Sequence, residues 1–425
     1  MTVDKSSQVK TQHARNSQSG GDAGLQAKPI WHGVILVAGG AVGAGMFALP
    51  LVSAGAWFCW AVLGLLIVST FTYLAAKLLI DVNVNYPVGT SFDTLVRTNL
   101  GNSWATINNM SIAFIMFILM YAYITAGAGI LEKSLASATG ENIKLPRPLL
   151  SFLFASVVAL FIWFGTSMVS RVSTLLMVAM CATFATANSG LLTSFELSVL
   201  FNGTTGEMVY LWSALPVFVT AFACAGLVPS LSSHYDNQSR KIALSILLGL
   251  LLALLVYVVW LASTLGNISR TEFIIVADNG GGLSALVAML QSHADNSLIS
   301  SSLVWFSHFA VITSFLSIGL GLAHFLVDKF TLGSSSMGRA KSVGIAFVPP
   351  FIASVFSPYG FVTAIAYAGV FVAFSFFIIP ALMYRKMALT DSKLSSHLPV
   401  LVLVFGLIII ALKLSSIFSF LPSYP

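Results

Sequence analysis

Charged side chains are scarce in this chain of 425 residues. Asp, Glu, Lys and Arg together make up 8% of the residues, whereas 57% are hydrophobic. So few charges cannot cover the water-exposed surface of a chain this long, which excludes a soluble globular protein. We therefore expect lipid to be the solvent for most of the chain.

Cysteine is also rare, and motifs for catalysis or metal binding are missing from the apolar runs. Cys59, Cys181 and Cys224 show no CxxC spacing, so neither a disulfide framework nor a zinc site is predicted. The runs contain no acidic pair, no HExxH motif and no Ser/His/Asp set. We predict no catalytic residue, no metal site and no cofactor, and we disfavour an intramembrane enzyme.

Long charge-free stretches dominate what is present. Nine of them can each hold a membrane helix of about 20 residues: 33–76, 98–131, 148–170, 172–195, 208–233, 242–269, 296–327, 342–384 and 394–412. The stretches 33–76 and 342–384 are about twice this length and are broken by Pro and Gly, so each should hold two helices. The sequence predicts an all-α polytopic membrane protein with about eleven spans.

The basic residues predict the orientation. With the N-terminus inside, the inner segments carry fifteen Lys and Arg residues and the outer segments carry four, as the positive-inside rule requires. Residues 1–30 are polar and predict a disordered cytoplasmic tail, followed by a permease domain at 31–425. We expect a bacterial inner-membrane protein with a periplasmic C-terminus. The net charge of +6 reflects the basic residues that set the orientation, and it does not indicate nucleic-acid binding.

Two spans contain small residues ahead of a proline. The first has four glycines within residues 39–45, before Pro50, and the sixth has FACAGLV at 222–228, before Pro229. Close helix packing through small residues is one interpretation. A discontinuous helix is the other, and two breaks five spans apart favour it. Inverted repeats at about 31–197 and 208–384, with an extra helix at about 399–421, would bring both breaks to one site.

Several segments resemble the bacterial aromatic amino acid permeases, which are the hydroxy and aromatic amino acid branch of the amino acid–polyamine–organocation superfamily. The segments are GAGMFALP at 43–50, SAGAWFCW at 53–60, GTSFDT at 89–94, YAYITAGAGIL at 121–131, GLVPS at 226–230, LGNISRTEFI at 265–274, TSFLSIGLGL at 313–322 and PYGFVTAIAYAG at 358–369. SAGAWF, SFDT and YAYI are closer to the tryptophan type. The resemblance implies a leucine-transporter-type fold with broken first and sixth helices, and symport of an aromatic amino acid with protons.

Three positions depart from that family. Met180 stands where relatives carry a lysine, Ala225 where they carry a histidine, and His324 where they carry an aspartate. Intramembrane ionisable groups are candidates for proton coupling, so the departures bear on the coupling ion more than on the fold. His308 and His324 are about 24 Å apart along one helix, and we predict that both are structural.

A zwitterionic substrate needs donors for its carboxylate and acceptors for its ammonium group, and two broken helices provide both without a charged side chain. We predict amides at the first break for the carboxylate and carbonyls at the sixth for the ammonium. The predicted substrate-binding residues are Gly43, Ala44, Gly45, Met46, Ala223, Cys224, Ala225 and Gly226, with Tyr121 and Tyr123 as candidates to close over the ring. Packing or interfacial anchoring is the alternative for the tyrosines, and their directions differ by about 200°, so only one can face inward.

Oxygen atoms near the first break suggest a possible coupling-ion site. The Ala41 carbonyl and the Thr313 and Ser314 hydroxyls could bind sodium, although ordinary hydroxyl packing is an equal alternative. The segment 267–292 predicts a short amphipathic helix or a solvated loop over the outer vestibule. Lys413 is predicted to extend to the membrane interface.

The function predicted from the sequence is a symporter that imports an aromatic amino acid, tryptophan in preference to tyrosine, with proton coupling. The alternatives are a sodium-coupled permease for another neutral amino acid, and a channel or sensor that does not accumulate solute. The expected partners are the amino acid substrate and the lipid bilayer.

Overall fold

The computed structural model of the protein describes residues 28–140, 145–193, 196–201, 207–294, 296–333, 335–389, 397–422 and 424. Nearly all of the predicted cytoplasmic tail therefore lies outside the described residues. The described part of the chain is helical and contains no strand.

The described part of the chain has ten or eleven candidate membrane spans, in agreement with the predicted number of about eleven. Ten helices are long and apolar enough to cross a membrane, and a bent pair of shorter helices supplies the first span. In chain order the spans are α2 (Ile30–Ala41) with η1 (Ala44–Phe47) and α3 (Ala48–Ser53), α4 (Trp57–Asn83), α6 (Asn102–Thr139), α7 (Arg147–Phe164), α8 (Thr166–Thr193), α10 (Met208–Ala221) with η3 (Ala225–Leu227) and α11 (Val228–His234), α12 (Ser239–Leu265), α15 (Ser297–Phe330), α16 (Ser336–Phe356), α17 (Phe361–Ala373) with η4 (Phe374–Ile378) and α18 (Ile379–Ala388), and α19 (His397–Ile417). Within the described residues, four short helices lie between spans: α5 (Phe92–Leu100), α9 (Leu197–Leu200), α13 (Arg270–Asp278) and α14 (Leu283–Ser292).

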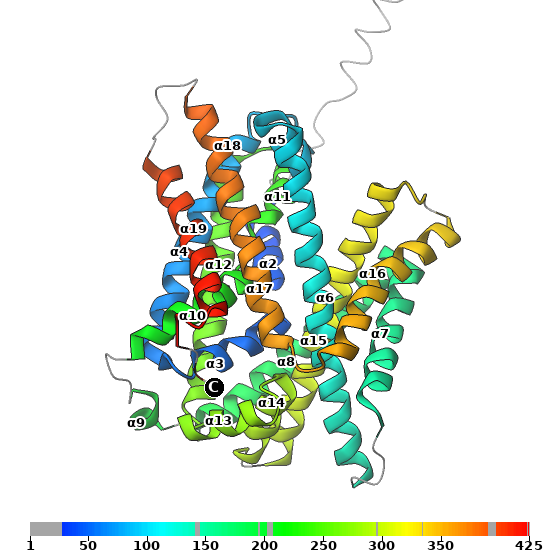
Figure 1. The fold of residues 1–425 in the computed structure, drawn as a ribbon, viewed down its shortest axis with the longest axis vertical. Coiled ribbons are helices and arrows are strands. Elements are labelled where there is room, and N and C mark those ends of the chain that lie inside the picture. The colour runs from blue at the N-terminus through cyan, green and yellow to red at the C-terminus, as the bar shows by residue number, and fades with distance from the viewer. Residues whose placement is uncertain are drawn as a thin grey trace, which may run out of the picture.

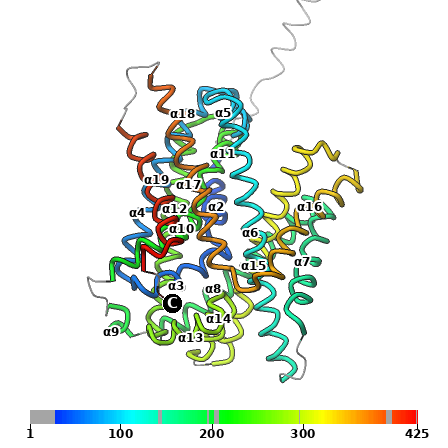
Figure 2. The backbone as a smooth tube through the Cα atoms, viewed as in Figure 1, coloured from blue at the N-terminus to red at the C-terminus, as the bar shows by residue number. Residues whose placement is uncertain are grey.

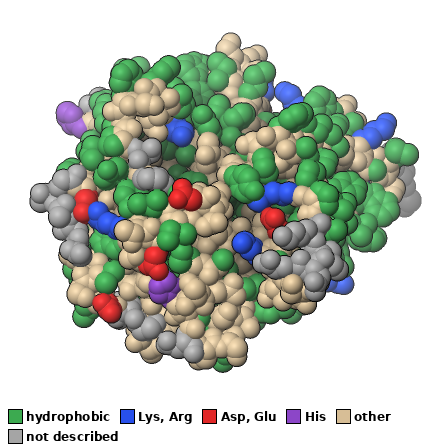
Figure 3. Space-filling model, turned by 60° about the horizontal axis from the view of Figure 1, so that its bottom comes forward, with side chains coloured by type: hydrophobic (Ala, Val, Ile, Leu, Met, Phe, Trp, Pro, Cys, Tyr) green, Lys and Arg blue, Asp and Glu red, His purple; other side chains and the backbone are tan. Residues whose placement is uncertain are grey.

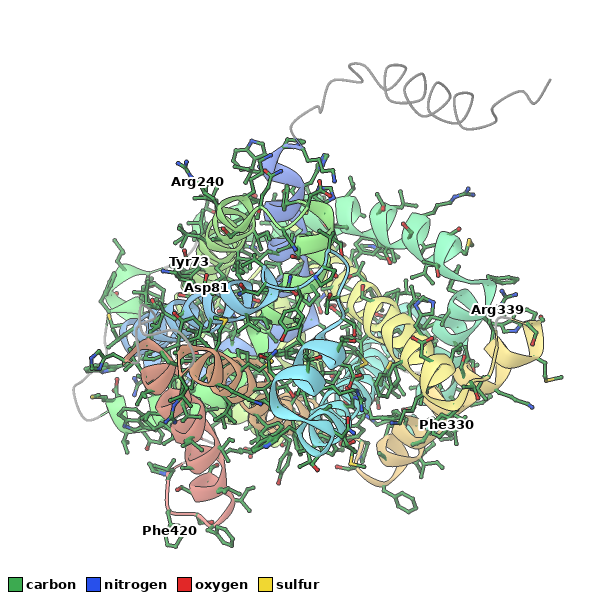
Figure 4. The ribbon with its side chains drawn as sticks, turned by 90° about the horizontal axis from the view of Figure 1, so that it is seen from above. Tyr73, Asp81, Arg240, Phe330, Arg339 and Phe420 are labelled. Carbon is green, nitrogen blue, oxygen red and sulfur yellow. The ribbon has the colours of Figure 1, made fainter. Side chains whose placement is uncertain are left out.

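The bundle has two ends, which we call the α5 face and the α13 face (Figure 1). Lys28 forms a 3.0 Å ion pair with Asp236, and Asn237 Nδ2 donates to the Tyr86 carbonyl oxygen at 2.9 Å. The start of α2, the turn between α11 and α12 and the turn before α5 therefore meet at the α5 face. Figure 4 looks onto this end and shows Arg240 and Arg339 projecting away from the bundle.

The packing of the helices is that of an inverted repeat. In such a repeat, each contact in the first five spans has an equivalent in the second five. The contact between spans one and seven (α2 with α12) is equivalent to the contact between spans six and two (α10 with α4). In the same way, the contact of α6 with α17 is equivalent to that of α15 with α8, and the contact of α6 with α7 is equivalent to that of α15 with α16. Figure 2 shows the chain path through these pairs, with α19 added outside. The 5+5 architecture predicted from the two breaks is confirmed.

The outer flanks are apolar because they face lipid. Leu175 on α8 and Phe356 at the end of α16 are 71% and 86% exposed, which in water would be unfavourable for such large side chains. Figure 3, turned toward the α13 face, shows the charged side chains gathered on that end while apolar side chains cover the sides.

The segment between α12 and α15 forms two helices, not one. The capping box of Ser269 and Glu272 starts α13, and Phe273 and Leu286 are buried beneath the segment, so it is packed and not a solvated loop. Partial burial would raise the pKa of Glu272, but hydrogen bonds from Ser269 and the nearby His293 lower it below its usual value. His293 Nε2 lies 3.1 Å from the Glu272 carboxylate and fixes α13 to the end of α14.

Candidate functional site

The first span is interrupted within its glycine-rich sequence. The two parts meet at an angle of 47°, and Gly43 between them is extended, with φ −169° and ψ −154°. Any residue can adopt this φ, so the backbone angle does not require glycine here. The limited space requires it, because a Cβ atom on Gly43 would overlap the Oγ atom of Ser314 on α15. Gly43 therefore permits close approach of α15 to the break.

The break frees backbone donors. The N–H of Ala44 donates to Ser314 Oγ at 2.9 Å, and the N–H of Met46 donates to the Gly43 carbonyl oxygen at 3.1 Å. Among the described residues, the N–H groups of Gly43 and Gly45 have no acceptor. A Cβ atom on Gly45 would have no other atom within 4 Å. Both glycines line the cavity described below, and free donors at the start of a half-helix are suited to bind an anionic group.

The sixth span is interrupted between Ala221 and Ala225. The N–H of Cys224 donates to the Phe222 carbonyl oxygen at 2.6 Å, and the N–H of Leu227 donates to the Cys224 carbonyl oxygen at 2.9 Å. The Cys224 carbonyl, one of the two predicted ammonium acceptors, is thus already used within the turn. The Ala221 carbonyl oxygen accepts instead from the Tyr257 hydroxyl of α12, at 2.8 Å.

A cavity of about 450 Å³ lies between the two breaks. Its walls come from α2, α6, α8, α10, α15 and α17, with Phe92 of α5 at one end. The cavity is lined by the halves of α6, α8 and α15 nearest the α5 face, so it extends from the breaks toward that face. No Asp, Glu, Lys, Arg or His among the described residues lines it. Its polar lining consists of backbone groups and the hydroxyls of Ser173, Thr220, Tyr123, Thr313, Ser314 and Ser317.

The predicted site residues divide between the cavity and the packing behind it. The cavity is lined by Ala41, Gly43, Gly45, Tyr123, Ala223, Gly226, Thr313 and Ser314. The remaining five, Ala44, Met46, Tyr121, Cys224 and Ala225, do not line it. Ala44 contributes only through its bond to Ser314, and Met46 and Cys224 are buried against neighbouring helices.

The tyrosine pair on α6 separates as the helical period requires. Tyr123 faces the cavity, which Ser314 also lines. The Tyr121 hydroxyl donates to the Ser357 carbonyl oxygen at 2.7 Å, in an apolar groove between α6, α16 and α17. Tyr121 is therefore not placed to contact a ligand in the cavity.

Some lining residues were not predicted. Thr220 donates to the Ile365 carbonyl oxygen of α17 at 2.8 Å, and its hydroxyl directly before the sixth-span break was a usable signal. Met177 and Phe376 gave no signal, because thioethers and aromatic rings in apolar helices are ordinary. Of the two positions in the first half and the sixth span that depart from the family, Met180 lines the cavity and Ala225 does not.

The two histidines of α15 lie away from the cavity. His308 Nε2 is 3.0 Å from Ser134 Oγ, and His324 Nε2 is 3.4 Å from Thr166 Oγ1. Each has a neutral hydroxyl partner on another helix, as the structural interpretation of these histidines expects.

Aromatic rings close the other side of the cavity. Phe47, Phe184, Trp260 and Phe306 form a four-ring cluster on the α13-face side of the breaks. Phe47 lies 4.9 Å from Phe306 and 5.3 Å from Trp260, and Phe184 lies 5.2 Å from Phe306, between ring centroids. The cavity is thus separated from the α13 face by packed apolar side chains.

Comparisons with known proteins show what the chain is similar to. The sequence model of the tryptophan/tyrosine permease family matches residues 26–414. A tryptophan-specific transport protein of Haemophilus influenzae is 40% identical over 361 residues, which cover 83% of this chain and 86% of the relative. The low affinity tryptophan permease of Escherichia coli K12 is 33% identical, covering 92% and 97%, and a tyrosine-specific transport system of Haemophilus influenzae is 29% identical, covering 91% and 97%.

Among solved structures, the chain is similar to Mhp1, a nucleobase-cation-symport-1 family transporter in a closed conformation with bromovinylhydantoin bound. The TM-score is 0.56 and the identity 14%, over 92% of each chain. At this identity the likeness shows the fold alone, which is that of leucine-transporter-type proteins.

Proposed function

The chain belongs to the tryptophan/tyrosine permease family, and from this premise we propose that it is a proton-coupled symporter that imports an aromatic amino acid, tryptophan in preference to tyrosine, across the bacterial inner membrane. Transport of an aromatic amino acid follows from the family and the fold. The substrate preference, the coupling ion and the direction are the proposed parts.

The observation that carries the proposal is an uncharged cavity between two broken helices. The free N–H groups of Gly43 and Gly45 serve the carboxylate, and carbonyl groups at the ends of α2 and α10 serve the ammonium. The volume of about 450 Å³ lies in the range of small-molecule sites. A zwitterion with a large apolar side chain fits this combination of backbone dipoles and apolar walls.

The cavity walls suit an aromatic side chain, and the names of the relatives support tryptophan over tyrosine. Met116, Met177 and Met180 give polarisable, adaptable contacts to an aromatic ring. The relatives with 40% and 33% identity are named for tryptophan, whereas those named for tyrosine are 29% identical.

The α5 face is proposed to be cytoplasmic. It carries the Lys and Arg residues assigned to inner segments, including Arg240 and Arg339 (Figure 4). The cavity extends toward this face and is closed on the other, so the structure corresponds to an inward-facing stage of transport.

Proton coupling is proposed over sodium coupling because Ser314 Oγ, one of the candidate ion ligands, already accepts a hydrogen bond from the Ala44 N–H at 2.9 Å. A hard cation needs several oxygens directed at it together.

Uptake of labelled tryptophan into proteoliposomes of the purified protein tests the proposal. We expect accumulation under an inward proton gradient, with inhibition by excess aromatic amino acids but not by leucine. Accumulation that requires a sodium gradient would overturn the coupling ion, and inhibition by leucine would overturn the substrate class. Equilibration without accumulation in sealed vesicles would indicate a channel-like protein.

A further inference from the structure

One buried tyrosine on α12 connects both helix breaks. The Tyr257 side chain is fully buried, and its hydroxyl lies 2.6 Å from the Ala41 carbonyl oxygen and 2.8 Å from the Ala221 carbonyl oxygen. Ala41 is the last residue of α2 and Ala221 is the last residue of α10. The hydroxyl thus lies where the C-terminal ends of two half-helices converge.

This convergence is electrostatically unfavourable without a donor. Each helix C-terminus carries about half a negative charge, and carbonyl groups that lose their helical partners at membrane depth need another donor. The Tyr257 hydroxyl supplies a positively polarised hydrogen at that point. The Phe222 ring, with its centroid 5.1 Å from the Tyr257 ring, holds the tyrosine ring in place.

A hydroxyl has one hydrogen, and here it faces two carbonyl oxygens. Both Ala41 and Ala221 also line the cavity, so the same backbone ends are within reach of a ligand. An ammonium group offers three donors and can satisfy the acceptor capacity that one hydroxyl leaves unfilled.

We propose that Tyr257 is a positioning residue: its hydroxyl holds the ends of α2 and α10 together and so fixes the carbonyl groups between which the substrate ammonium binds. The inference rests on the proposed function, because it concerns the ammonium of the same amino acid. A neutral O–H group thereby occupies a position between carbonyl dipoles that would otherwise suit a cation.

The test compares Tyr257→Phe with a matched control, Tyr235→Phe. Tyr235 is also buried and bridges two segments, since its hydroxyl accepts from the Gly33 N–H at 3.0 Å and contacts the Ile30 carbonyl oxygen at 3.0 Å. Both variants remove one buried hydroxyl that binds α2, but only Tyr257 lies at the break.

The readout is the ratio of two affinities of the purified protein, measured by thermal stabilisation. The ligands are tryptophan and indole-3-propionate, which keeps the ring and the carboxylate but lacks the ammonium. In Tyr257→Phe we expect affinity for tryptophan to fall about tenfold, equivalent to about 1.4 kcal/mol, and affinity for indole-3-propionate to change less than twofold. The ratio in Tyr235→Phe should equal that of the wild type.

An unchanged ratio in a folded Tyr257→Phe protein would overturn the inference, because a purely structural hydroxyl would affect both ligands equally. If that variant does not fold, p-aminophenylalanine at position 257 replaces it, since it keeps an N–H donor on a ring of the same shape. A wild-type ratio there supports the inference, and a lost preference for tryptophan overturns it. A wild-type protein that binds no tryptophan would overturn the proposed function itself, and the inference with it.

Discussion

The contact between Gly43 and Ser314 gives the sharpest prediction about the first-span break. In Gly43→Ala the added Cβ would overlap Ser314 Oγ, although it would lie at an ordinary 3.8 Å from Ser314 Cβ. To relieve the overlap, Ser314 must turn away or α15 must shift. Either change removes the hydrogen bond from the Ala44 N–H.

The magnitude follows from these two effects. Overpacking by one methyl group costs about 1–3 kcal/mol, and the lost hydrogen bond costs about 1 kcal/mol. Their sum of about 2–4 kcal/mol corresponds to roughly a 30-fold or greater loss of affinity if the native arrangement is the one that binds substrate.

A double-mutant cycle separates the overlap from other effects of the substitution. Ser314→Ala removes the Oγ atom and should weaken tryptophan binding only about fivefold, by leaving the Ala44 N–H without its acceptor. Adding Gly43→Ala in that background should cost almost nothing, because the overlapping atom is gone. Binding is measured on purified protein with labelled tryptophan.

Gly45→Ala is the control for stability, since no atom lies within 4 Å of its added Cβ. It should keep the wild-type apparent Tm even if it weakens binding, whereas Gly43→Ala should lower the apparent Tm. Equal costs of Gly43→Ala in the wild-type and Ser314→Ala backgrounds would refute the reasoning.

Three further predictions follow from the described geometry. Tyr123→Phe should raise KM for tryptophan several-fold in the proteoliposome assay, because it removes a cavity hydroxyl, whereas Tyr121→Phe should change KM less than twofold; the reverse order would contradict the placement of the pair. Glu272→Gln should lower the apparent Tm at pH 7. The pKa of Glu272 in the folded protein lies below its ordinary value of 4.5. The stabilisation that the ionised carboxylate gives the folded protein is therefore complete above pH 4.5 and is lost as the pH falls through the folded pKa. The melting difference between the two proteins should therefore vanish in acid, and a constant difference from pH 7 down to pH about 3 would count against stabilisation of the ionised Glu272 carboxylate by its hydrogen bonds. Cys224 should resist a maleimide with or without tryptophan, because it is 2% exposed, while Cys59 reacts with a lipid-soluble maleimide; rapid labelling of Cys224 would show that the sixth-span break opens.

The span count and the two breaks could be predicted because their signals are local. Charge-free length determines whether a segment can cross a membrane. Glycine before Pro50 or Pro229 disfavours a continuous helix whatever the rest of the chain packs against it. The segment after α12 was predicted less well. Its second helix, α14, has a short apolar sequence whose burial depends on contacts with α6 and α15.

The site was only partly predictable, because lining a cavity is a tertiary property. The 200° phase between Tyr121 and Tyr123 predicted that one of them faces inward, but which one depends on how α6 rotates against α15 and α17. Tyr257 was missed because its two acceptors, Ala41 and Ala221, lie 216 and 36 residues away. A tyrosine in an apolar helix shows no sign in the sequence that it binds distant carbonyl groups.

The four-ring cluster of Phe47, Phe184, Trp260 and Phe306 has a consequence for the electrical insulation of the membrane. A proton leak needs a continuous file of water or polar groups, and an apolar constriction excludes such a file by dewetting. The rings lie between the cavity and the α13 face and carry no hydroxyl or ionisable group. Water that enters the cavity therefore meets an apolar barrier before it reaches the α13 face, so in this state the protein offers no continuous water path by which ions could leak across the membrane.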